Sequence, residues 1–68
     1  MTHRAKIVYD LTNSGDAMSD ADVAYGRTYY KELADKLRQC GPVFKLAANE
    51  ADRIYHTLDG FFRARQTR

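Results

Sequence analysis

Cys40 and His56 are the side chains in this chain whose types could support nucleophilic chemistry. An imidazole activates a thiol only when the two groups lie within hydrogen-bond reach. Cys40 precedes a Gly41-Pro42 turn, and His56 follows that turn by about thirteen residues, or roughly 20 Å of helix. We therefore expect no catalytic pair. Cys40 is expected to be a small buried hydrophobe, and His56 to form a solvated i,i+4 pair with Asp52.

Three aspartates, Asp16, Asp20 and Asp22, raise the question of a calcium site. Their order lacks the central glycine and terminal glutamate of a calcium-binding loop. The cysteine and the two histidines also lack the paired spacing of a zinc site. Phosphate-binding glycine motifs and the G-x-S-x-G nucleophile motif do not occur either. The sequence thus predicts a non-enzyme without metal or cofactor, in which the acids cap a helix and favour hydration.

The chain has 68 residues, a formal net charge of +2 and one cysteine. This length fits one domain, 1–68, whose core buries only about 60% of the surface of the unfolded chain. A single free thiol cannot form an internal disulfide and is typical of a reducing compartment, so we expect a cytoplasmic protein. No stretch approaches the roughly 20 apolar residues of a membrane span, so no membrane partner is expected. Because such a small core is marginal, we expect burial against a partner chain.

Two amphipathic helices are predicted, at 20–40 and 43–65, and they should pack as an antiparallel hairpin. Ser19 resembles the cap of the first helix, and Gly41-Pro42 ends it. The apolar positions of both helices recur at steps of three and four, and they are Val23, Gly26, Tyr30, Leu33, Leu37 and Cys40, then Phe44, Ala47, Ala51, Ile54, Leu58 and Phe61. Counting from the turn predicts the opposed pairs Leu37–Ala47, Leu33–Ala51, Tyr30–Ile54, Gly26–Leu58 and Val23–Phe61.

Residues 1–19 are predicted to form a strand and loop arm, because residues 4–11 alternate between polar and apolar side chains. A lone strand leaves backbone groups unpaired, so it needs a second strand. This favours a homodimer paired through Ile7, Tyr9 and Leu11. The alternative is an extended segment lying across the helices. The predicted fold class is therefore mainly α, with an N-terminal extended segment or lone β-strand before a two-helix hairpin that dimerisation completes.

The chain holds more aromatic side chains than one hairpin seam can cover. Tyrosine, phenylalanine and arginine are enriched at protein interfaces. The predicted protein-binding residues are those that lie off the seam or on its shoulder, namely Tyr25, Tyr29, Tyr55, Phe62 and Arg63. The alternative is that these rings pack under the N-terminal segment or stand singly exposed.

A strand followed by two helices is also the architecture of ribbon-helix-helix repressors, whose strand side chains enter the major groove. In that alternative the protein is a small dimeric DNA-binding regulator. Its nucleic-acid contacts would come from Arg4 and Lys6 or from the basic tail, Arg63, Arg65 and Arg68. The acidic connector after residue 11 and the outward Asp10 argue against it, because both would face phosphates.

The sequence favours a non-catalytic protein–protein interaction module. We expect a homodimer that acts as an inhibitor, anti-activator or adaptor on a larger protein, of the kind that phages and plasmids carry. Nothing in the residue pattern names that partner.

Overall fold

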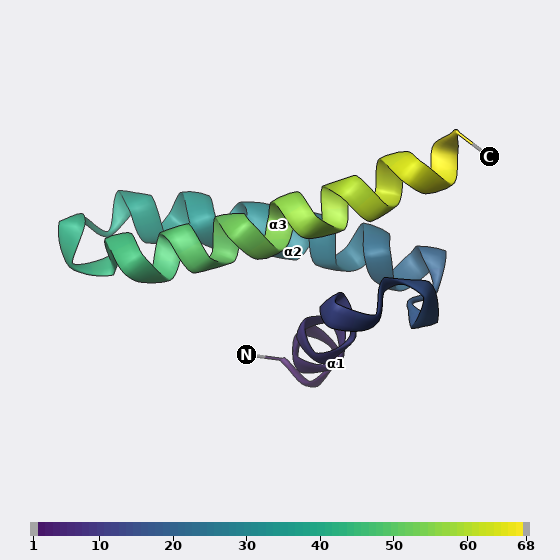
Figure 1. Ribbon diagram of the computed structural model, residues 1–68. Coiled ribbons are helices and arrows are strands. Elements are labelled where there is room, and N and C mark those ends of the chain that lie inside the picture. Colours follow the sequence, from purple (N-terminus) through teal and green to yellow (C-terminus); the bar gives the residue numbers. More distant parts are fainter. Residues whose placement is uncertain (1, 68) are drawn as a thin grey trace.

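A computed structural model describes residues 2–67, and these residues are helical almost throughout (Figure 1). The elements in chain order are α1 (His3–Leu11), the 3₁₀ segment η1 (Thr12–Ala17), α2 (Asp20–Gln39), the 3₁₀ turn η2 (Pro42–Phe44) and α3 (Lys45–Gln66). Helices α2 and α3 form a long antiparallel hairpin that turns at η2. Helix α1 packs against this hairpin away from the turn, so the turn projects as a free end (Figure 1). No helix in this part of the chain is long and apolar enough to cross a bilayer.

The N-terminal segment is a helix, so the predicted strand over residues 4–11 is wrong. The Thr2 hydroxyl caps α1 by accepting the Ala5 backbone N–H at 3.1 Å. Ala5 and Val8 are fully buried and lie one helical turn apart. Alternation over eight residues indicated period two, but this segment also has apolar side chains at helical spacing. The α2–α3 hairpin offers a surface that covers the apolar face of a helix here. This tertiary contact favours the helix over the strand.

Gly26 makes the docking of α1 possible. A methyl group at this position would collide with Val8 Cγ1 and would lie 2.8 Å from Leu58 Cδ1. Val8 therefore fills the space that a side chain at residue 26 would take, and three helices meet there. The buried Tyr30 hydroxyl donates to the carbonyl of Ala5 at 3.2 Å, which fixes α1 to α2 by a second contact.

The start and the turn of the hairpin lie where the sequence predicts, whereas α3 spans Lys45–Gln66 and not the predicted 43–65. The Ser19 hydroxyl accepts the Asp22 backbone N–H at 3.1 Å and caps α2. Gly41 has φ +103°, the left-handed conformation that favours glycine. Pro42 begins η2, where its missing N–H removes no helical hydrogen bond.

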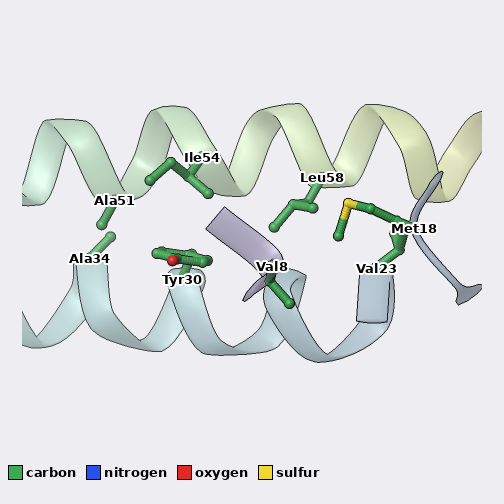
Figure 2. Packing of buried hydrophobic residues seen from close by; sticks show 8 residues of the cluster. All are labelled: Val8, Met18, Val23, Tyr30, Ala34, Ala51, Ile54 and Leu58. Atoms are coloured by element: carbon green, nitrogen blue, oxygen red, sulfur yellow. The ribbon is translucent and has the colours of Figure 1, made fainter. Parts of the chain in front are cut away.

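The core differs from the predicted seam near the turn. Its buried cluster consists of Val8, Met18, Val23, Tyr30, Ala34, Ala51, Ile54 and Leu58 (Figure 2). Ala34, not Leu33, lies opposite Ala51 (Figure 2). Close contact of two small residues brings the helices together there and turns Leu33 and Leu37 to the flank, where both are half-buried. Cys40 is exposed, so its prediction as a buried hydrophobe is also wrong.

Arg65 closes the open end of the hairpin. Its guanidinium binds Asp20 Oδ1 at 2.7 Å and donates to the Met18 carbonyl at 2.7 Å. Only 18% of its side chain is exposed. The arginine that the sequence assigned to a basic tail therefore ties α3 to the start of α2.

Candidate functional site

Three of the five predicted protein-binding residues, Tyr55, Phe62 and Arg63, lie on the side of the hairpin where Arg27 and Lys31 reach across from α2 to α3. We call this surface the aromatic–arginine face and define it by Arg27, Lys31, Tyr55, Asp59, Phe62 and Arg63. Its members come from α2 and from three successive turns of α3.

Arg27 organises one end of the aromatic–arginine face. Its guanidinium carbon lies 4.4 Å from the centre of the Phe62 ring, and its Nε donates to Asp59 Oδ1 at 2.7 Å. The second oxygen of Asp59 pairs with Arg63 Nε at 2.9 Å. The hydrogen bond from Arg27 is the main cause of a lowered pKa at Asp59; burial opposes it, and the charges of Arg63 and Arg27 add to it. One carboxylate thus holds two guanidinium groups in place, and one of these groups lies over the Phe62 ring.

Lys31 and Tyr55 form the other end of the face. The ammonium nitrogen lies 5.3 Å from the centre of the tyrosine ring, within cation–π range. Beside them is an open groove of about 390 Å³. Its walls carry both signs of charge and one aromatic ring, and they are Arg27, Thr28, Lys31, Glu32, Asp35 and Tyr55.

Tyr25 and Tyr29, the other two predicted protein-binding residues, lie on the side of α2 that contacts α1. Their rings stack at 5.8 Å, and Tyr25 shares a hydrogen bond with the Thr2 hydroxyl at 3.0 Å. Arg4 covers the Tyr25 ring at 4.3 Å. Both tyrosines are half-buried against the core. Tyr25 thus takes part in the packing of α1, and partner binding through the exposed parts of both rings stays a prediction.

The predicted dimer residues do not share one surface. Ile7 and Tyr9 are 40% and 41% exposed. They are two positions apart, however, and side chains at this spacing point to nearly opposite sides of a helix. Leu11 packs against the core. Since α1 offers no strand edge, the observation that motivated a strand-paired homodimer is absent from the described residues.

Most residues of the nucleic-acid alternative are engaged in internal contacts. Arg4 pairs with Asp22 at 3.4 Å and donates to the Ala21 carbonyl at 3.3 Å. Arg63 and Arg65 hold the aspartates described above. Lys6 is exposed on α1, and Arg68 lies outside the described residues. The ribbon-helix-helix architecture requires a strand where α1 lies, so major-groove recognition by a strand is not available to this fold.

Cys40 and His56 are both exposed. His56 Nε2 lies 3.4 Å from Asp52 Oδ2, which is the predicted i,i+4 pair. Asp52 also contacts Arg38 at 3.5 Å. Within residues 2–67, no group of three or more histidine, cysteine, aspartate or glutamate side chains is placed to hold a metal ion.

The turn of the hairpin forms a second surface, which sequence reasoning missed. We call residues 40–47 the hairpin tip. Val43 and Leu46 are 88% and 83% exposed, and Phe44 is 43% exposed. The prediction placed Phe44 and Ala47 in the seam, yet both are exposed. The sequence contained a signal for this exposed surface, because Val43 and Leu46 fall outside the apolar repeat that leads to Ile54 and Leu58.

Comparison with protein-family models, curated proteins and solved structures finds no match for this chain. Its geometry alone supports the functional proposals below.

Proposed function

We propose that this protein is a non-catalytic protein–protein interaction module that docks onto a larger protein through the aromatic–arginine face. In this role it acts as an inhibitor, anti-activator or adaptor, by occupying a surface of that protein. The supporting observation is the arrangement of two cations over two rings, Arg27 on Phe62 and Lys31 on Tyr55, beside a groove of about 390 Å³.

The composition of this face suits protein recognition. Tyrosine and arginine are among the residue types enriched in binding hot spots, because they combine apolar area with directed hydrogen bonds. The groove is lined by two acids and two bases, Glu32 and Asp35 with Arg27 and Lys31, so a partner segment that carries both charges can complement it.

The rigidity of the face also supports the proposal. Asp59 is held by Arg27 and Arg63, so these side chains lose little conformational freedom when a partner binds. Ordering a long side chain on association costs roughly 0.5–1.5 kcal/mol. The network already orders these side chains in the folded protein, so binding does not have to order them again.

The test is an affinity pull-down from native lysate, read by mass spectrometry, with the wild-type chain and a Tyr55→Ala/Lys31→Ala variant. We expect one protein to be enriched by the wild type and its apparent affinity to fall about thirtyfold or more in the variant, as for interface anchors worth about 2 kcal/mol. The matched control is Glu50→Ala/Arg53→Ala. It removes an ion pair whose side chains are 49% and 67% exposed and which forms no part of the face.

Because Tyr55 is half-buried, a second variant separates binding from folding. Lys31→Glu reverses one exposed charge above the ring and should weaken binding while circular dichroism and melting stay at wild-type values. Undiminished enrichment with both face variants would overturn the proposal. Recovery that depends on nucleic acid, and is lost after nuclease treatment, would favour the DNA-binding alternative instead.

A further inference from the structure

The hairpin tip combines exposed apolar side chains with positive charge. Val43 and Leu46 are the most exposed large hydrophobic residues of the described chain, and they stand at the free end of a molecule about 39 Å long. Figure 1 shows this end projecting beyond α1, with no other element beside it. Side chains exposed to this degree project from a convex surface and do not line a groove.

The charged residues between positions 36 and 49 are all basic, and the acids Asp35 and Glu50 flank this stretch. Residues 36–49 include Lys36, Arg38 and Lys45 and contain no aspartate or glutamate. Arg38 reaches Asp52 at 3.5 Å, but half of its side chain stays exposed. Lys36 and Lys45 are exposed. The tip therefore has exposed apolar side chains with basic residues near them. We call Lys36, Arg38 and Lys45 the cationic collar.

The backbone of the tip is suited to a region poor in water. Cys40 donates to the Lys36 and Leu37 carbonyls at 3.2 Å, and Gly41 donates to Arg38 at 3.4 Å. Phe44 donates to Gly41 at 3.2 Å, and Lys45 donates to Pro42. Pro42 has no N–H. These internal bonds reduce the penalty for moving backbone donors away from water.

We propose that the hairpin tip inserts shallowly into the surface of an anionic phospholipid bilayer without spanning it, in contrast to the expectation from the sequence that there is no membrane partner. Val43 and Leu46 enter the boundary between head groups and acyl chains, where apolar side chains are stabilised by leaving water. Lys36, Arg38 and Lys45 remain at the level of the head groups and contact lipid phosphates and carboxylates.

Shape and charge favour a bilayer over other occupants of the tip. A fluid bilayer closes around a convex apolar point, whereas a protein needs a matching cavity. A second copy of the chain would bring two cationic collars together, and like charges at close range oppose this contact. An anionic surface instead attracts every charge of the collar.

The experiment uses the full chain with vesicles of phosphatidylcholine and with vesicles of an equimolar mixture of phosphatidylcholine and phosphatidylserine. Wild-type protein should sediment with the anionic vesicles, and less of it at high salt. Val43→Ser/Leu46→Ser should lower the partition coefficient on the order of a hundredfold. Replacing Lys36, Arg38 and Lys45 by glutamine should lower it by a similar factor, at about fivefold per charge. Glu50→Ala/Arg53→Ala should bind as the wild type does.

Insertion can be read directly because the chain contains no tryptophan. Val43→Trp should show a blue-shifted emission when anionic vesicles are added. Gln66→Trp, an exposed position at the other end of α3, should show none.

Equal binding of the wild type and Val43→Ser/Leu46→Ser, or no vesicle binding by the wild type, would overturn the proposal. Equal binding to neutral and anionic vesicles would do so too, since the collar would then contribute nothing. If the wild type does not bind vesicles and Val43→Ser/Leu46→Ser no longer binds a partner protein, the tip would be a protein-binding site instead. None of these outcomes involves Lys31 or Tyr55, so they are distinct from a failure of the aromatic–arginine face.

Discussion

Tyr30 shows how one side chain serves both the core and the docking of α1. Its ring is 1% exposed, and its hydroxyl donates to the Ala5 carbonyl. Burial is the main cause that raises the pKa of Tyr30 from 10.0 to about 12, and the neighbouring Tyr29, Tyr9 and Tyr25 add to it. The folded state therefore favours the protonated hydroxyl.

The raised pKa of Tyr30 predicts a loss of stability at high pH. The contribution is complete below pH 10.0, the value for the unfolded chain, and disappears as pH rises to about 12. A difference of two pKa units corresponds to about 3 kcal/mol at most. Urea unfolding should show this decline in the wild type. Tyr30→Phe, which should cost about 1 kcal/mol at neutral pH through its lost hydrogen bond, should lack this part of the slope. Parallel pH profiles for the two proteins would show that Tyr30 is not the group involved.

Gly26 and Gly60 provide a matched pair of glycines within helices. A Cβ at Gly26 would collide with Val8, whereas a Cβ at Gly60 would have no heavy atom within 4 Å. Alanine gains about 1 kcal/mol over glycine in a helix interior, but overpacking a tight contact costs about 1–3 kcal/mol. Gly60→Ala should therefore raise the free energy of unfolding and Gly26→Ala should lower it, as measured by chemical denaturation.

A second substitution identifies the cause of the Gly26 effect. The double variant Gly26→Ala/Val8→Ala should lose less unfolding free energy than the two single variants lose together. The reason is that the smaller side chain at position 8 makes room for the new methyl group. Strict additivity would place the strain elsewhere.

The residues that form the hairpin were largely predictable at the scale of elements. Ser19, Gly41 and Pro42 act locally, through capping and turn conformation, so their roles follow from residue type and position alone. Residues 4–11 could not be assigned in this way. Their apolar side chains fit both a strand and a helix, and the choice depends on a groove at Gly26 that only the folded hairpin creates.

The limits of prediction were similar for the candidate site. Tyr55, Phe62 and Arg63 share one side of α3, and helical periodicity was sufficient to group them. Their partners Arg27 and Lys31 come from α2, and pairing them required the register and rotation of two helices. A close approach at Ala34 and Ala51 sets that rotation, which also turned Leu33 toward the flank and left Leu46 exposed.

The contact between α2 and α3 yields a graded prediction for two leucines. Leu58 is fully buried between the helices, whereas Leu33 is half-buried at the flank. Leu58→Ala should therefore cost roughly 2–5 kcal/mol, within the range for core leucines, and Leu33→Ala clearly less. Thermal and urea unfolding of both variants measure the difference. Equal losses would mean that the two positions share the same packing environment, contrary to the observed rotation of α2.

At the scale of the whole molecule, the hairpin separates two surfaces of different chemistry. The aromatic–arginine face holds paired charges around two rings, whereas the tip holds exposed apolar side chains and three basic residues. Leu46 and Tyr55 are nine positions apart, or about 13 Å along α3. The ion pair of Arg65 with Asp20 and the packing of Val8 on Gly26 stabilise the opposite end, away from the tip. Substitutions on one surface should therefore act independently of the other.

This separation predicts that the chain can link a protein to a membrane. Anionic vesicles mixed with native lysate should retain the partner protein only when the wild-type chain is added, because one surface must hold the bilayer while the other holds the protein. Val43→Ser/Leu46→Ser should leave the partner bound to the chain but free of vesicles. Lys31→Glu should leave the chain on the vesicles without the partner, and Glu50→Ala/Arg53→Ala should retain both. Quantitative mass spectrometry of the vesicle pellet measures all four proteins in one experiment. If the tip variant lost the partner even without vesicles, or the face variant lost the vesicles, the two surfaces would be coupled and the bridging role would fail.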